Sequence, residues 1–178
     1  ALKKEITHDM LTLSQAVAND IARMMYERVE NVHSWSRLSI MQEAKIGDVD
    51  KRLSVFLKEL NTSYGNIYRN IYVIDAQSNV VASSNSAQIG KTISELPNWF
   101  NIAQSSSKVS VSQLSGQTLP LSATILDANG DIEPFILIAE FNWQNIENIL
   151  NSSAKQQTSA MLFNEQDLPI AKTSNWEG

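Results

Sequence analysis

The spacing of the apolar residues changes after Tyr64–Gly65, and this change constrains the fold more than any other feature. Before Tyr64, apolar residues such as Met10, Leu13 and Val17 recur every three or four positions, a spacing that predicts amphipathic helix. After Gly65, β-branched and aromatic residues gather in short runs separated by turn-forming residues, which is typical of strands. The chain is therefore predicted to be α+β, with its helices first.

One long helix is predicted from the start of the chain to about Ala44. No proline precedes Pro97 and the first glycine is Gly47, so no breaker interrupts the pattern. Asp48 is placed to cap a second helix, because aspartate accepts hydrogen bonds from free backbone N–H groups at a helix start. A helix of about 40 residues rises about 60 Å. It is either an amphipathic core helix or a signalling stalk and dimer seam.

One antiparallel sheet of about five strands is predicted between residues 67 and 142. Its strands are IYVID, VVASS, KVSVSQ (from Lys108), LPLSATIL (from Leu119) and PFILIAEF (from Pro134), joined by turns at AQSN, Ser115–Gly116 and DANG. The almost continuous apolar run of PFILIAEF suits the middle of the sheet. A short helix around Trp99 is predicted in the crossover between the second and third strands, and the long helix is expected to cover the other face.

The residues after 142 predict a linking helix and part of a second module. Trp143–Leu150 has the pattern of a helix, and Phe163–Asn175 can be laid without gaps on Ile74–Ser86. This match predicts a repeated hairpin or is a coincidence of two hairpins. The chain is accordingly divided into a helical scaffold (1–62), a sheet module (63–142), and a linker with a truncated or rudimentary module (143–178).

Composition and missing motifs exclude several classes of function. A net charge of -5 without a basic stripe argues against a nucleic-acid partner. The absence of cysteine excludes disulfides, thiolate metal sites and cysteine nucleophiles. Two histidines, His8 and His33, are too few for a triad or a three-histidine metal site, and no phosphate-binding glycine loop is present. We expect no enzyme, and we assign no catalytic residue, metal or cofactor.

The order of these segments resembles a known family of sensors. IYVIDAQSNVVASS is followed by IGKTISELPNWFNIA, KVSVSQ, LSATILDANGD and ILIAEFNW, after a long helix. This order is similar to the double Cache arrangement, the PAS-like extracytoplasmic sensor of bacterial chemoreceptors, sensor kinases and cyclic-dinucleotide enzymes. The resemblance implies that residues 63–142 form the membrane-distal module and that residues 143–178 begin a membrane-proximal one.

The resemblance also implies a small-molecule pocket between the sheet and the loops after its second strand. Trp99 and Phe100 stand where the family has an aromatic pair on the lid of the pocket. The amino-acid-binding branch has an arginine where this chain has Pro97, and an aspartate for the ligand amine where this chain has Glu140. An amine, a neutral polar compound or a ligand held by Lys91 is therefore favoured over a standard amino acid.

Further candidate ligand residues are polar side chains on the predicted strands: Tyr72, Ser112, Ser122 and Thr124. Strand register decides where they point, since a shift of one residue moves a side chain to the other face. Each candidate also has a structural interpretation. The aromatic pair could be core, the lysine could be surface, and Glu140 could be a solvated strand end or a partner of Arg69.

The function implied by the resemblance is signal transduction. The chain would be the periplasmic ligand-binding part of a receptor anchored in the inner membrane, either a monomer or a homodimer, with a chemotaxis, two-component kinase or cyclase output. The long helix would pass a conformational change to that output. The alternative is a dimerisation or partner-protein interaction module of a membrane receptor that binds no ligand, because the same long helix would serve it.

Overall fold

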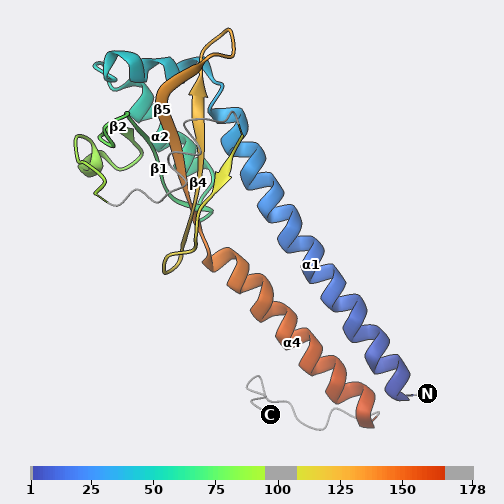
Figure 1. Cartoon of the computed structure of the whole chain (residues 1–178). Helices are drawn as coiled ribbons and strands as arrows, with labels where there is room; N and C mark the ends of the chain where they lie inside the picture. The colour runs from blue at the N-terminus through green and yellow to red at the C-terminus, as the bar shows by residue number, and fades with distance from the viewer. Residues whose placement is uncertain (1, 95–107, 167–178) are drawn as a thin grey trace. The chain divides into compact units, whose positions relative to one another are not determined.

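The computed structural model describes residues 2–94 and 108–166 (Figure 1). The chain divides into two compact units, which are described separately. The larger unit, Tyr26–Trp143, contains the sheet and the helices packed on it. The smaller unit combines Ala1–Met25 with Gln144–Gly178.

Helix α1 spans Leu2–Trp35, so the predicted helix end at about Ala44 was wrong. The chain turns at Ser36 and continues as the 3-10 helix η1, Ser39–Ile46. Both segments bond to the end of strand β4: the Ser36 carbonyl accepts from Leu126 N at 3.4 Å, and Gln42 Nε2 donates to the Leu126 carbonyl at 2.9 Å. These contacts with a distant strand favour a turn where the local sequence contains no helix breaker.

Helix α2, Arg52–Ser63, has Lys51 at its N-cap position, and the Asp48 carboxylate accepts from its first turn, as predicted. Gly47 and Asp48 have positive φ angles of 71° and 48°, which turn the chain away from η1. The buried Asp48 carboxylate then accepts from Leu53 N at 2.9 Å, from Ser54 N at 3.0 Å and from the Ser54 hydroxyl at 2.7 Å. The carboxylate thus satisfies two backbone donors that a helix start leaves free.

The sheet has five antiparallel strands in the order β2-β1-β5-β4-β3, which confirms the predicted α+β fold. The strands are β1 Tyr68–Ile74, β2 Val80–Ser83, β3 Ser110–Val111, β4 Thr118–Leu126 and β5 Ile132–Asn142. Strand β5 lies in the middle, as its apolar run predicted, and β3 is shorter than KVSVSQ predicted. A 3-10 turn, η2 (Ser86–Gln88), follows β2, and α2 packs against β1 and β2.

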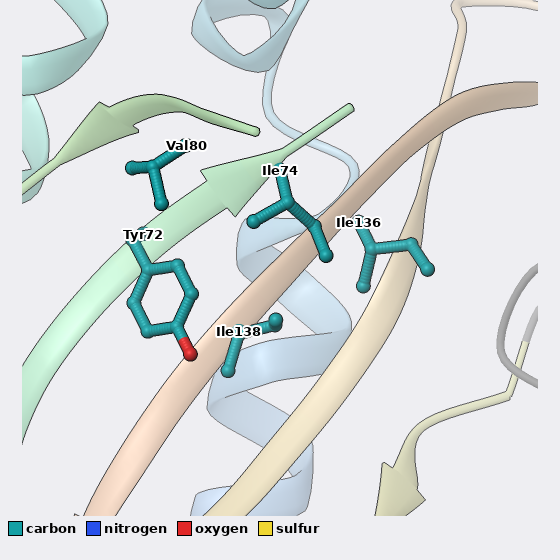
Figure 2. Close-up of a cluster of buried hydrophobic side chains, with 5 residues drawn as sticks. All are labelled: Tyr72, Ile74, Val80, Ile136 and Ile138. Carbon is teal, nitrogen blue, oxygen red and sulfur yellow. The ribbon is translucent and has the colours of Figure 1, made fainter. Parts of the chain in front are cut away.

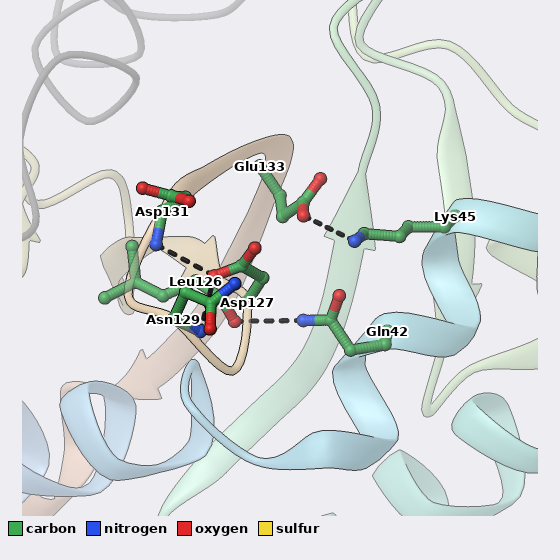
Figure 3. A network of polar contacts seen from close by, with 7 residues as sticks. All are labelled: Gln42, Lys45, Leu126, Asp127, Asn129, Asp131 and Glu133. Atoms are coloured by element: carbon green, nitrogen blue, oxygen red, sulfur yellow. Dashed lines mark hydrogen bonds and ion pairs between the residues drawn. The ribbon is translucent and has the colours of Figure 1, made fainter.

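The turn between β4 and β5 is held by one carboxylate. Asp127 Oδ1 accepts from Asn129 N at 2.8 Å and from Asp131 N at 2.9 Å (Figure 3). Beside this turn, Lys45 of η1 forms an ion pair with Glu133 of β5 (Figure 3). The predicted DANG turn is therefore confirmed, and it lies against η1.

A bulge near the start of β1 changes the faces of the sheet to which successive side chains point. Tyr68 pairs with Phe141 and Asn70 pairs with Glu140, with the register shifted between them. Phe141 and Glu140 are consecutive, so their side chains point to opposite faces. Tyr68 and Asn70 therefore also point to opposite faces, although they lie two residues apart.

Tyr68 connects the sheet to the end of α1. Its hydroxyl accepts from Asn31 Nδ2 at 3.0 Å, and the Arg28 guanidinium lies 5.7 Å from the centre of its ring. Trp35 and Tyr64 complete an edge-to-face aromatic cluster with it, with ring centres 5.3–5.6 Å apart. Such contacts each stabilise by about 1 kcal/mol beyond area burial.

The smaller unit contains α4, Gln144–Gln166. Residues 163–166 are helical, so a strand beginning at Phe163 was wrong for these positions; residues 167–178 lie outside the described residues. Within this unit, Val17 of α1 and Ile149 of α4 help to line an open groove of about 380 Å³. Across residues 2–94 and 108–166, no helix has the length and apolar content needed to cross a bilayer.

Candidate functional site

Four predicted ligand residues lie on one face of the sheet: Tyr72, Ser122, Thr124 and Glu140. Directly paired residues of neighbouring strands share a face. Tyr72 and Ser122 both pair with Ile138, Thr124 pairs with Ile136, and Glu140 lies two residues along β5 from Ile138. The sheet register therefore brings together polar groups from three strands, and this face is called the polar face below.

An apolar floor lies among these polar groups. It is formed by the buried side chains of Tyr72, Ile74, Val80, Ile136 and Ile138, drawn in Figure 2. The side chain of Ile93 packs against this cluster, while α1 lies on the far side of the sheet (Figure 2). A molecule bound on the polar face would therefore meet aliphatic carbon at its centre.

Tyr72 and Glu140 form a hydrogen-bonded pair at the edge of this floor. Burial raises the pKa of the Tyr72 hydroxyl well above its ordinary value, and the nearby Glu140 carboxylate raises that pKa further. The neutral hydroxyl is therefore the donor. Burial also raises the pKa of the Glu140 carboxyl, while the hydrogen bond from Tyr72 and the charge of Arg69 act in the opposite direction. Above this raised pKa, the Glu140 carboxyl is a partly desolvated anion that a bound cation would stabilise.

Ser122 is a buried donor and acceptor whose hydroxyl has no partner in residues 2–94 and 108–166. Its side chain is 0% exposed, and its hydroxyl makes no hydrogen bond within the part of the chain that the structure describes. An unpaired buried hydroxyl costs about 1–3 kcal/mol. A polar group of a bound molecule at this position would remove that cost.

A second polar cluster, not predicted from the sequence, begins at Asn70. The Asn70 amide bonds to the Ser84 hydroxyl and to Gln88 Oε1, and the Ser83 hydroxyl donates to Gln88 Oε1 at 3.0 Å. Asn70 pairs with Glu140 across the strands, so the cluster adjoins the polar face. The signal available in the sequence was an asparagine inside an apolar strand, YRNIYVI, where asparagine is disfavoured.

Two more of the predicted ligand residues, Ser112 and Lys91, lie within the described part of the chain. Ser112 is half-buried just after β3, with its backbone N–H donating to the Pro120 carbonyl at 2.9 Å. Lys91 is exposed. Trp99 and Phe100 lie outside the described residues. In residues 2–94 and 108–166, no group of three or more acidic or histidine side chains is arranged to hold a metal ion.

Comparison with known proteins gives a likeness of fold. No family model and no curated protein matches the sequence. Among solved structures, the sensor domain of the V. cholerae histidine kinase DctB superposes with a TM-score of 0.63 at 16% identity, over 82% of this chain and 59% of that one. The E. coli DcuS sensor domain gives 0.51 at 11% identity, over 79% and 98%.

A third similar structure is the ligand-binding domain of the Campylobacter jejuni chemoreceptor Tlp3 in complex with L-valine. Its TM-score is 0.57 at 16% identity, over 84% of this chain and 62% of that one. The chain thus spans about 60% of the DctB and Tlp3 domains and almost all of the DcuS domain. These neighbours are extracytoplasmic sensor domains with the Cache or PAS-like fold, which confirms the fold that the sequence resemblance implied.

Proposed function

We propose that this chain is the ligand-sensing part of a bacterial membrane receptor, and that it binds a small molecule on the polar face of its sheet. The fold is shared with sensor domains of the histidine kinase DctB, of DcuS and of the chemoreceptor Tlp3. The observation that carries the proposal is the buried polar row over an aliphatic floor. Tyr72, Ser122 and Glu140 lie there at a cost in desolvation that a bound ligand would offset.

The charge of the site favours an amine or a neutral polar ligand. Glu140 supplies an anion that is partly removed from water. The nearby cation, Arg69, is already engaged, donating to the Gln117 carbonyl and to Asn142 Oδ1 at 3.3 Å each. An ammonium group beside Glu140 and Tyr72 would form a charge-assisted hydrogen bond, whereas a carboxylate there would be repelled.

The signal would pass from the polar face to α1 through β1. A ligand that contacts Glu140 lies against the strand residue Asn70, and the bulge joins Asn70 to Tyr68, which is fixed to α1 through Asn31. A small displacement of β1 would therefore be transmitted to α1 through the hydrogen bond between Tyr68 and Asn31. Only a ligand that binds one arrangement more tightly than the other shifts the population. Residues 1–62 would serve as the scaffold of this periplasmic domain, and residues 143–178 would continue towards the membrane.

A calorimetric and thermal-shift screen tests the proposal. The whole chain would be tested with simple amines, neutral polyols, amino acids and dicarboxylates, alongside Glu140→Gln and Tyr72→Phe. A ligand at 100 times its dissociation constant should stabilise the native state by about 2.7 kcal/mol. We expect amine binding to be lost in Glu140→Gln and retained in Glu59→Gln, which changes an exposed glutamate on α2.

Two results would contradict this function. Amine binding that survives in both site variants would place the ligand elsewhere. An absence of binding across all four classes would favour the alternative, a module that dimerises or binds a partner protein. Sedimentation measurements over a range of protein concentrations would then test for dimers.

A further inference from the structure

The unpaired hydroxyl of Ser122 carries an inference about the kind of ligand, and this inference rests on the function proposed above. The hydroxyl lies on β4, between β5 and β3, is 0% exposed, and has no hydrogen-bond partner among the described residues. Its cross-strand partners are Ile138 on β5 and Ser110 on β3, and Leu121 and Ala123 flank it on β4. The Ser122 hydroxyl is therefore left without a hydrogen bond to the described residues, whereas most buried polar groups in proteins have one.

The position of Ser122 relative to Glu140 fixes a spacing. Ser122 pairs with Ile138, and Glu140 lies two residues further along β5 on the same face. The two residues are thus diagonal neighbours on adjacent strands, for which the separation is roughly 7 Å between backbones and less between side chains. A small molecule that bridges them needs two polar groups separated by about three carbon atoms, an estimate from that same spacing.

The chemistry of the two groups follows from the charges around them. The ammonium end belongs beside Glu140 and the Tyr72 hydroxyl, because a buried carboxylate is stabilised by an opposite charge. The other end meets the neutral Ser122 hydroxyl and lies one strand away from the Glu140 anion. A carboxylate there would gain one neutral hydrogen bond and be repelled by Glu140. A hydroxyl or amide would gain the hydrogen bond without that repulsion.

We infer that Ser122 is a specificity-determining residue for a ligand that combines an ammonium group with a neutral hydrogen-bonding group, as in an amino alcohol. Glu140 holds the cation, Ser122 binds the neutral group, and the floor at Ile138 contacts the carbon chain between them. Ser122 thus discriminates an amino alcohol both from a plain alkylamine and from an amino acid.

Three matched probes test this inference: 3-aminopropan-1-ol, butylamine and β-alanine. They share an amine and differ at the far end in carrying a hydroxyl, a methyl or a carboxylate. Their dissociation constants would be measured by calorimetry on the whole chain and on Ser122→Ala and Glu140→Gln. We expect the wild type to bind 3-aminopropan-1-ol about fivefold to tenfold more tightly than butylamine, the effect of one hydrogen bond. β-Alanine should bind more weakly than 3-aminopropan-1-ol.

The variants separate the two levels of the proposal. Ser122→Ala should abolish the preference for 3-aminopropan-1-ol and leave butylamine binding unchanged, whereas Glu140→Gln should weaken both amines. The exposed Thr62→Ala on α2 is the hydroxyl control and should preserve the preference. Folding is not at risk in Ser122→Ala, since the change removes a buried hydroxyl that makes no hydrogen bond to the described residues, and a melting temperature equal to or above that of the wild type would verify this.

Each contrary result has a defined meaning. A preference for the hydroxyl probe that persists in Ser122→Ala, or equal binding of all three probes, would overturn the role of Ser122 while leaving amine binding at Glu140 intact. Tighter binding of β-alanine than of 3-aminopropan-1-ol would overturn the inference that the group beside Ser122 is neutral. No binding of any probe, or amine binding that is unaffected in Glu140→Gln, would overturn the proposed amine site and this inference with it.

Discussion

Asn31 Nδ2 donates a 3.0 Å hydrogen bond to the hydroxyl of Tyr68, and this bond joins the end of α1 to the start of the strand that carries Asn70 and Tyr72. The Tyr68 ring is 3% exposed and lies against the edge of Trp35. The contact between helix and sheet is therefore both polar and aromatic. A substitution at Tyr68 can affect the hydrogen bond to Asn31 and the packing against Trp35.

Replacing Tyr68 with phenylalanine should destabilise the protein at neutral pH. The substitution keeps the ring and removes the acceptor of Asn31, so we expect a loss of about 1 kcal/mol in the free energy of unfolding. Urea unfolding would measure it. The matched control is Tyr26→Phe on the exposed side of α1, where the tyrosine ring is 66% exposed, and no loss is expected there. Equal stabilities of the wild type and Tyr68→Phe would contradict the contribution of the hydrogen bond.

The same variant should behave differently in alkali. Burial raises the pKa of Tyr68 to about 12, whereas an unfolded tyrosine titrates near about 10. The folded state therefore retains a proton that the unfolded state loses, and the stability from this group is full below pH 10 and is lost as pH rises to 12. Between these values the wild type should lose more stability than Tyr68→Phe. Parallel slopes of unfolding free energy against pH would exclude this role for the hydroxyl.

Asp48→Ala should be among the more damaging single changes in the larger unit. It leaves Leu53 N and Ser54 N without their acceptor at the start of α2. Loss of a helix cap costs about 1–2 kcal/mol, and this cap is buried, so we expect at least the upper value. Thermal or urea unfolding would measure the loss against Asp50→Ala, an exposed aspartate two residues away. Equal effects of the two substitutions would argue against the cap.

Glu140→Gln should stabilise the protein progressively as pH rises. Burial raises the pKa of the folded carboxyl above the unfolded value of about 4.3. Stability from this group is therefore full below that value and is lost as pH rises through the folded pKa. Glutamine has no such dependence, so the difference in melting temperature between variant and wild type should grow between pH 4 and neutrality. The exposed Glu59→Gln provides the baseline, and a difference independent of pH would rule out the titration of Glu140.

The sequence predicted the elements of this fold better than their ends. The helices, strands and turns could be predicted because their signals are local. These signals are the apolar spacing, the capping residue Asp48 and the turn sequence DANG. The end of α1 was missed because tertiary bonds from Leu126 to Ser36 and Gln42 set it. No Gly or Pro marks that turn, so nothing local distinguishes it from continued helix.

The candidate site was predictable in composition and not in arrangement. Tyr72, Ser122, Thr124 and Glu140 were identified as polar residues on strands. Their gathering on one face depends on pairing register across β1, β5 and β4, which spacing within one strand does not define. The proximity of Asn70 to Gln88, in the turn beyond β2, could not be predicted for the same reason.

The bulge at Arg69 adds one residue to β1 without changing which faces of the sheet Tyr68 and Asn70 occupy. With Arg69 deleted, alternation would run unbroken: Tyr68 would directly precede Asn70, would stay opposite Phe141, and would still point away from the face of Glu140. The bulge shifts the alternation of side chains within β1. Tyr68, before it, contacts α1, whereas Asn70 and Tyr72, after it, point to the polar face. Deletion of Arg69 would therefore leave Tyr68 on the side of α1 and Asn70 on the polar face, and would remove the bonds from Arg69 to the Gln117 carbonyl and to Asn142 Oδ1.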